Sequence, residues 1–176
     1  STWDTLCQAS AQIYEKTGKY GYMAYADEQL GYWNFVYQAG GCILNEDKTK
    51  AGFLEPATRK AMEFYVNLQK EPWCPDQNYF AETAPGNAFF SGQGAMYLEG
   101  NWNLMSLREN NAEMEGKWDV AVLPKCPDPE KGDGRATISN GLSYATGAHG
   151  KKLSYALDFL KKGYRNPTGF RRWVKV

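Results

Sequence analysis

The chain has 176 residues, enough for one ordinary domain or slightly more. Apolar residues make up 43% of it and charged residues 23%, a balance typical of a globular protein with a hydrophobic core. Twenty basic and twenty acidic residues give no formal net charge, which argues against a nucleic-acid-binding protein or one that binds anionic membranes. No apolar run approaches the roughly 18 residues of a membrane-spanning helix, and the first residues lack the basic and apolar parts of a signal peptide.

Apolar residues at helical spacing predict three helices in the first half of the chain, with short strands between them. Thr2 is the expected N-cap of the first helix, Gly18 its end, and Gly40-Gly41 the end of the second. Pro56 suits the first turn of the third helix. The expected helices cover residues 3–14, 30–39 and 56–68, and the expected strands cover residues 20–25 and, at most, 42–44.

The second half reads as loops with shorter elements between them. Three prolines in residues 71–86 predict a loop, and prolines and glycines in residues 125–135 predict an exposed turn. The other expected elements are helical segments at 87–91, 101–110, 151–163 and 167–174, strands at 95–99 and 118–123, and extended chain at 137–146 with a bend at Asn140-Gly141. Strands that alternate with helices place the chain in the α/β class, with a small mixed sheet flanked by helices.

The four cysteines do not have the spacing of metal ligands. The chain contains no Cys-x-x-Cys pair, and its single histidine, His149, is far from every cysteine in the sequence. Cys74 and Cys126 both begin Cys-Pro-Asp tripeptides in expected loops, where a disulfide is sterically easiest. Nothing in the sequence establishes oxidising surroundings, so unpaired thiols are the favoured expectation.

Motifs of the common enzyme families are absent from the sequence. It has no nucleophile elbow, phosphate-binding loop, zinc-protease motif or dinucleotide fingerprint, so we expect no catalytic residue, metal or cofactor. A pair of carboxylates could support glycoside hydrolysis, and the candidates are Asp27, Glu28 and Glu99. Asp27 and Glu28 have a simpler explanation, because negative charge stabilises the start of a helix.

Two segments combine aromatic and polar residues at the expected starts of helices. The first holds Tyr32 and Trp33, and the second holds Glu99, Asn101 and Trp102. In α/β proteins, ligands bind where strands end and helices begin. A sugar ring fits such a place, because an aromatic ring can cover its C–H face while amides and carboxylates bind its hydroxyls. Trp102 and one of Tyr32 or Trp33 would cover the sugar, and Asn101, Glu99 and Asn140 would bind its hydroxyls. The alternative is that these tryptophans only pack helices against the sheet.

The order of several short motifs resembles that of a known family, the extracellular solute-binding proteins of carbohydrate ABC importers, or maltose-binding-protein-like group. Each motif is weak alone, but their order is specific and covers nearly the whole chain. The motifs are Thr2-Trp3-Asp4, Lys19-Tyr20-Gly21-Tyr22, Gly31-Tyr32-Trp33, Gly40-Gly41, Phe90-Ser91-Gly92-Gln93-Gly94-Ala95-Met96, Gly100-Asn101-Trp102, Trp118-Asp119-Val120-Ala121-Val122-Leu123-Pro124 and Ser139-Asn140-Gly141.

The resemblance implies a periplasmic-binding-protein-like receptor whose two lobes close on a sugar about a hinge. It assigns stacking on the sugar to Trp102 and a second aromatic contact to Tyr32 or Trp33. Asn140-Gly141 matches the bend where the chain returns from the second lobe toward the first. The implied protein is the substrate-binding component of a sugar ABC transporter. It is not an enzyme, it delivers a mono- or oligosaccharide to permease subunits, and it works in the periplasm or as a cell-surface lipoprotein whose anchor lies outside this chain.

The chain is about half the length expected for the family. The resemblance therefore implies a C-terminal, second lobe at residues 1–136 and a crossover segment with a helix at residues 137–176 that normally pack on the other lobe. Half a cleft should bind sugar weakly, and the apolar stripe of residues 151–163 should pack on its own lobe or on a second chain, which would give a dimer. Two alternatives stay open: a carbohydrate-active enzyme or binding module that uses Glu99, and a receptor for a polyamine or another small solute held by Glu99 and Trp102.

Overall fold

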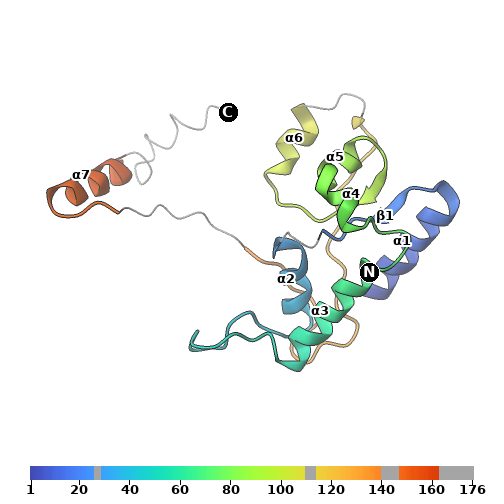
Figure 1. The fold of residues 1–176 in the computed structure, drawn as a ribbon, viewed down its shortest axis with the longest axis horizontal. Coiled ribbons are helices and arrows are strands. Elements are labelled where there is room, and N and C mark those ends of the chain that lie inside the picture. The colour runs from blue at the N-terminus through green and yellow to red at the C-terminus, as the bar shows by residue number, and fades with distance from the viewer. Residues whose placement is uncertain (26–28, 110–113, 140–146, 163–176) are drawn as a thin grey trace. The chain divides into compact units, whose positions relative to one another are not determined.

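The chain divides into two units, residues 1–138 and 139–176. The computed structural model describes residues 1–25, 29–109, 114–139 and 147–162 (Figure 1). The first unit contains α1–α6 and two strands, and α7 belongs to the second. The elements are α1 (Trp3–Thr17), β1 (Tyr20–Tyr22), α2 (Gln29–Gln38), α3 (Pro56–Leu68), α4 (Gln77–Glu82), α5 (Pro85–Phe90), β2 (Gly94–Met96), α6 (Asn103–Glu109) and α7 (Lys151–Leu160).

Both ends of α1 are fixed by the residues that the sequence indicates. At the start, the backbone N–H of Thr5 donates to the Thr2 hydroxyl at 3.3 Å, and the Thr2 N–H donates to the Thr5 hydroxyl at 2.7 Å. At the end, Gly18 adopts a left-handed conformation with φ of 69° and donates its N–H to the Tyr14 carbonyl. The predicted cap and stop of this helix are therefore confirmed.

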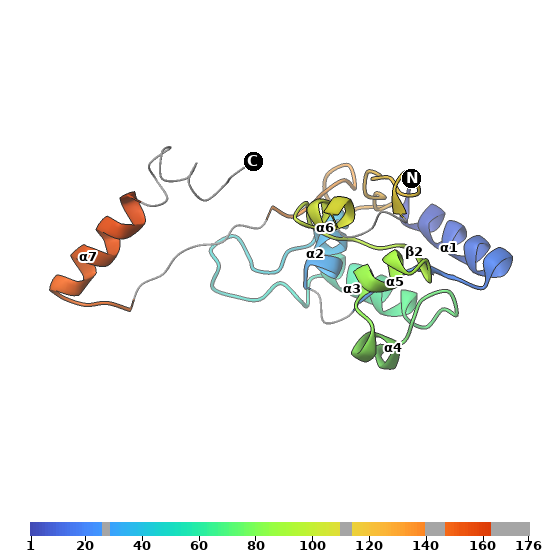
Figure 2. The same cartoon turned by 90° about the horizontal axis from the view of Figure 1, so that it is seen from above.

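The main core lies where α1, α2 and α3 meet. Figures 1 and 2 both show α2 running beside α3. Aromatic rings fill the space between these helices: Trp3 stacks on Phe64 with centroids 4.4 Å apart, and Phe35 meets the edge of Trp3 at 5.5 Å. The buried residues of this core are Trp3, Tyr22, Ala24, Phe35, Val36, Ala39, Ala57, Ala61, Tyr65, Leu68, Trp73, Cys74 and Cys126.

The sheet of the first unit pairs β1 with β2 in parallel. Tyr20 lies opposite Gly94 and Tyr22 opposite Met96, so the carboxyl ends of both strands reach the same edge. Within the described residues this sheet is parallel, whereas the sequence predicts a mixed one. Both strands are also shorter than predicted, because the chain turns away from the pairing after Tyr22 and Met96 and lines a hollow instead.

Two further predictions of local structure are wrong, and the strand expected at most at residues 42–44 is only partly formed. Residues 118–123 form no strand in the described structure, and Val120 and Val122 are 68% and 78% exposed. Their alternating pattern is that of a strand, but a strand also needs a neighbour to pair with. Residues 42–44 contribute only a single bridge, from Leu44 to Ala51. The predicted loop at 71–86 contains α4, which Asp76 begins by accepting the Tyr79 N–H at 2.9 Å.

All four cysteines are free thiols. Cys74 and Cys126, the pair for which a disulfide was sterically easiest, are both buried in the main core. Burial raises the pKa of Cys74 to about 11, so this thiol stays protonated near neutral pH and acts as a small apolar residue.

The second unit is described at residues 139 and 147–162. Its helix α7 ends at Leu160, three residues before the predicted end, and Tyr155 and Phe159 are 74% and 65% exposed. The predicted helical segment at 167–174 lies outside the described residues. In the described ranges no helix has both the length and the apolar character needed to cross a bilayer. The assignment of residues 1–136 to a second lobe and 137–176 to a crossover segment stays a prediction.

Candidate functional site

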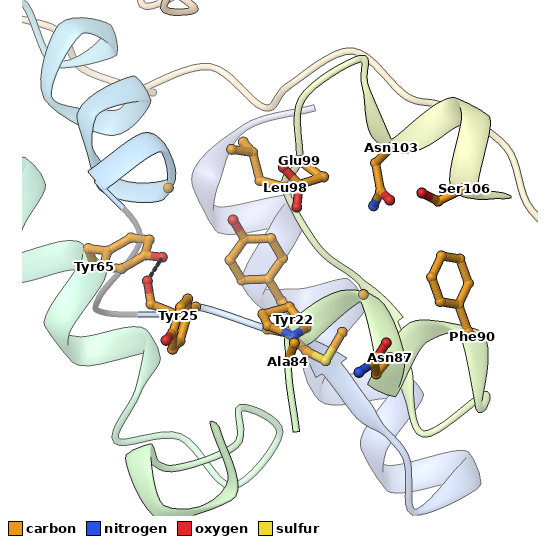
Figure 3. A pocket seen from close by; sticks show the side chains of 14 residues that line it. Tyr22, Tyr25, Tyr65, Ala84, Asn87, Phe90, Leu98, Glu99, Asn103 and Ser106 are labelled. Atoms are coloured by element: carbon orange, nitrogen blue, oxygen red, sulfur yellow. Dashed lines mark hydrogen bonds between the residues drawn. The ribbon is translucent and has the colours of Figure 1, made fainter. Parts of the chain in front are cut away.

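A hollow of about 480 Å³ lies at the carboxyl ends of β1 and β2. In open α/β sheets this edge is where ligands bind, because strands end there and new helices begin. The residues after both strands and the facing sides of α2, α3, α5 and α6 enclose it (Figure 3). Its lining residues are Tyr22, Met23, Tyr25, Gly31, Tyr65, Ala84, Pro85, Gly86, Asn87, Phe90, Leu98, Glu99, Asn103 and Ser106.

The lining combines aromatic rings with neutral polar groups. Tyr22, Tyr25, Tyr65 and Phe90 supply rings, and the Tyr65 hydroxyl donates to the Tyr25 carbonyl at 2.9 Å, which fixes one wall (Figure 3). Asn87, Asn103 and Ser106 supply amide and hydroxyl groups. Such a mixture suits a ligand with both apolar C–H faces and hydroxyls. No group of three or more metal-ligating side chains occurs in the described part of the chain.

Glu99 is the single charged residue among those that line the hollow in the described structure. Its Oε1 accepts the N–H of the next residue, Gly100, at 2.8 Å, which orients the carboxylate. Burial, followed by the nearby negative charge of Glu99, raises the pKa of Tyr97 to about 12. The Tyr97 hydroxyl therefore stays neutral and accepts a hydrogen bond from the side-chain amide of Asn103. This bond positions Asn103 at the hollow.

Trp102 lies on the turn between two lining residues, Glu99 and Asn103, and is 56% exposed. An exposed indole of this kind can contact a ligand, because most of its surface is not used in packing. The ring lies over the backbone of Gly100: a methyl group at that position would come within 2.2 Å of it. Asn101, on the same turn, is exposed. The structure starts α6 at Asn103, two residues later than the sequence predicts.

Replacing Gly100 by alanine is expected to displace the Trp102 ring while leaving the fold intact. The added methyl group meets the far end of an exposed side chain, which can move into solvent at little cost. We expect the urea midpoint of unfolding to stay within experimental error. Sugar binding, measured by saturation-transfer NMR, should weaken about tenfold if Trp102 contacts the ligand. Equal binding by both forms would show that the position of this ring is irrelevant.

Tyr32 and Trp33 are half-buried and are not among the residues that line this hollow, although the adjoining Gly31 is. The Tyr32 ring meets the edges of Trp33 and Tyr65, with centroids 6.5 Å and 6.0 Å away. The indole N–H of Trp33 is buried, and the described part of the chain offers it no acceptor. A ligand contact by either ring stays a prediction. Asn140, Gly141, Asp27 and Glu28 lie outside the described residues.

The structure adds residues that the sequence did not indicate. Tyr22, Asn87, Phe90 and Ser106 reach the hollow from three separate elements, β1, α5 and α6, and no spacing rule links these elements. The position of Tyr22 could have been predicted from the sequence, because it lies in an expected strand and ligands bind near the ends of such strands.

A second hollow, of about 640 Å³, lies where the same two strands begin. Lys19 and Tyr20 at the start of β1 and Ser91 to Gln93 before β2 contribute to it. The Tyr79 hydroxyl and the Gln93 side chain bond to each other at 2.7 Å beside it, so these polar groups already have partners. The hollow at the carboxyl ends is the better candidate for a ligand site, because that edge of an open α/β sheet is where ligands bind.

The chain belongs to a family described as bacterial extracellular solute-binding protein, whose model matches residues 1–176. None of the curated proteins matches it significantly. Its fold, periplasmic-binding-protein-like, is that of solved sugar-binding proteins of ABC transporters.

Three solved structures illustrate the likeness. A solute-binding protein from Thermotoga lettingae, bound with α-D-tagatose, is 31% identical, with a TM-score of 0.59 over 73% of this chain and 34% of that one. The sugar-binding protein MalE from Xanthomonas citri is 29% identical, with a TM-score of 0.60 over 70% and 32%. The cyclic α-maltosyl-1,6-maltose binding protein from Arthrobacter globiformis is 27% identical, with a TM-score of 0.58 over 73% and 32%. The matched part of the chain thus spans about a third of the length of each of these relatives.

Proposed function

We propose that this chain forms part of the substrate-binding component of a sugar ABC transporter. In this proposal, residues 1–136 form one of two lobes that close on a mono- or oligosaccharide, and the complex delivers the sugar to a membrane permease from the outer side of the membrane. The proposal rests on family membership and on the tagatose and maltosyl-maltose ligands that the names of two relatives state. The protein binds its ligand without transforming it.

The observation that carries the proposal is the combination of an exposed indole and a carboxylate at a hollow lined by tyrosines. Trp102 offers a flat apolar face to the C–H side of a pyranose or furanose ring. Glu99 accepts hydrogen bonds from sugar hydroxyls, and the amides of Asn103 and Asn87 can donate or accept. Asn101, exposed on the same turn, is available to the part of the ligand outside the hollow.

Truncating the indole should remove most of the binding. We expect Trp102→Ala to weaken the dissociation constant for D-tagatose or maltose at least tenfold, because aromatic contacts dominate binding to sugar-sized ligands and are lost completely on truncation. Saturation-transfer NMR suits this measurement, since one lobe alone should bind in the millimolar range. Trp118→Ala is a suitable control, because Trp118 does not line the hollow. Binding that survives Trp102→Ala unchanged would refute the proposed site.

The same samples distinguish sugar binding from the alternatives. A receptor for cations should respond to spermidine rather than to sugars in a thermal-shift assay, since a ligand stabilises the state that binds it. A glycoside hydrolase should cleave a labelled oligosaccharide and lose that activity in Glu99→Gln. We expect neither result.

A further inference from the structure

The hydroxyl of Tyr22 has no hydrogen-bond partner within the described part of the chain. Tyr22 ends β1, is only 5% exposed, and lines the hollow. Figure 3 shows its ring rising from the strand toward Leu98 and Glu99. The hydroxyl itself is not among the fully buried atoms of the described chain, so it meets the open space of the hollow rather than the protein interior. A polar group that faces a hollow and has no protein partner is available to a ligand, which can take the place of the water that it otherwise binds.

Tyr22 can act as a hydrogen-bond donor throughout the physiological pH range. Burial raises its pKa well above the ordinary value, so the hydroxyl does not ionise near neutral pH. A phenol hydroxyl can both donate and accept, whereas a carboxylate such as that of Glu99 can only accept. Oε1 of Glu99 accepts one hydrogen bond from the Gly100 N–H, so the carboxylate keeps acceptor capacity for a ligand.

The charges around the hollow discriminate between classes of sugar. A neutral sugar hydroxyl can accept from Tyr22 and donate to Glu99, so it satisfies both groups. A carboxylate or phosphate on the ligand can accept from Tyr22 but has no hydrogen to offer Glu99. Among the described lining residues no Lys, Arg or His is present to neutralise such an anion, and the neighbouring carboxylate repels it. Lys19 contributes to the other hollow, at the opposite ends of the strands.

We propose that Tyr22 is a ligand-contacting residue at the floor of this hollow, and that Tyr22 and Glu99 together select uncharged sugars over acidic ones. This inference rests on the proposed function and adds to it a binding residue and a rule for specificity. Trp102 then stacks on the sugar ring at the rim of the hollow, while Tyr22 forms a hydrogen bond with the ligand group that reaches the floor.

The test compares sugars that differ in one group, with the 176-residue chain and four variants. The ligands are D-glucose, D-glucuronate and D-glucose 6-phosphate, with D-tagatose and maltose as further neutral sugars, and saturation-transfer NMR gives the dissociation constants. Tyr22→Phe removes only the hydroxyl, and Tyr37→Phe is its control, on the exposed side of α2. Glu99→Gln removes only the charge, and Glu63→Gln, exposed on α3, is its control.

We expect the unmodified chain to bind at least one neutral sugar and to bind glucuronate and glucose 6-phosphate at least tenfold more weakly than glucose. Tyr22→Phe should weaken neutral-sugar binding about fivefold to tenfold, the usual effect of one lost hydrogen bond to a ligand. Glu99→Gln should bring the acidic sugars within about threefold of glucose. The two control variants should bind as the unmodified chain does.

Unchanged binding in Tyr22→Phe, or equal binding of acidic and neutral sugars, overturns this inference. If Trp102→Ala still abolishes binding in that case, the proposed function stands without it. If no neutral sugar binds the unmodified chain, both fail. The melting temperature of ligand-free Tyr22→Phe should match that of the unmodified chain, because the lost hydroxyl makes no hydrogen bond within the described part of the protein. A lowered melting temperature that accounts for the weaker binding also overturns the inference.

Discussion

Replacing Gly21 by alanine is expected to lower the free energy of unfolding by about 3 kcal/mol or more. Gly21 is the middle residue of β1 and lies directly against α1: a methyl group on it would come within 2.3 Å of the Ser10 Cα and 2.4 Å of the Ser10 carbonyl oxygen. These are backbone atoms of a helix, so no side chain can rotate away. Either α1 must move off the strand or the strand must shift, and overpacking of this kind costs more than the usual 1–3 kcal/mol range when backbone has to move.

Urea unfolding followed by tryptophan fluorescence measures this change. Gly86→Ala provides a control of the opposite sign: it lies in α5, where the nearest atom to an added methyl group is 3.8 Å away. Alanine there should leave stability unchanged or raise it by up to about 1 kcal/mol, since it favours the helix more than glycine does. A Gly21→Ala protein as stable as the unmodified chain would mean that α1 and β1 are not packed as closely as described.

Replacing Gln38 by leucine should lower the free energy of unfolding by about 2–4 kcal/mol. Gln38 is 2% exposed, and its Oε1 accepts the indole N–H of the equally buried Trp3 at 2.7 Å. Its Nε2 donates to the Ala136 carbonyl at 3.1 Å. Leucine fills a similar volume but leaves a buried indole N–H and a carbonyl unpaired, each at a cost of about 1–3 kcal/mol.

A double-mutant cycle with Trp3→Phe isolates the buried hydrogen bond. Phenylalanine removes the indole N–H, so Gln38→Leu should cost at least about 1 kcal/mol less in that background than in the unmodified chain. Strict additivity of the two changes in urea unfolding would contradict a direct bond between these side chains. The same glutamine joins α1 and α2 to residues 136–138, where Asn34 also accepts the Ile138 N–H at 3.0 Å. A variant that loses both the Gln38–Ala136 and the Asn34–Ile138 hydrogen bonds should therefore have residues 136–138 detached from α2.

The helices were predictable because their signals are local. Thr2 and Gly18 mark the two ends of α1, and each does so through a contact with a residue only three or four positions away in the chain. Proline at the start of α3 and the glycines after α2 act in the same short-range way. The α4 helix was missed because its prolines suggested a loop, although Asp76 was available as its N-cap.

The strands were predicted less well, since a strand exists only where a neighbour pairs with it. The alternating residues 118–123 have the pattern and the composition of a strand, yet Val120 and Val122 face solvent. Conversely, Tyr20–Tyr22 forms a strand because β2 pairs with it. The two strands are far apart in the sequence: Tyr20 pairs with Gly94, 74 residues further along the chain.

The sequence by itself determined the family, most of the helices and one segment that lines the hollow. The order of its motifs identifies a solute-binding protein, and the polar and aromatic turn from Glu99 to Trp102 is visible in the residue types alone. Only the tertiary structure decided which side chains share the hollow: it brings Tyr22, Asn87 and Ser106 together with Glu99 and leaves Tyr32 and Trp33 outside the lining. The physical reason is that a cavity is formed by segments far apart in the chain, whose meeting depends on how helices and strands pack rather than on any local pattern.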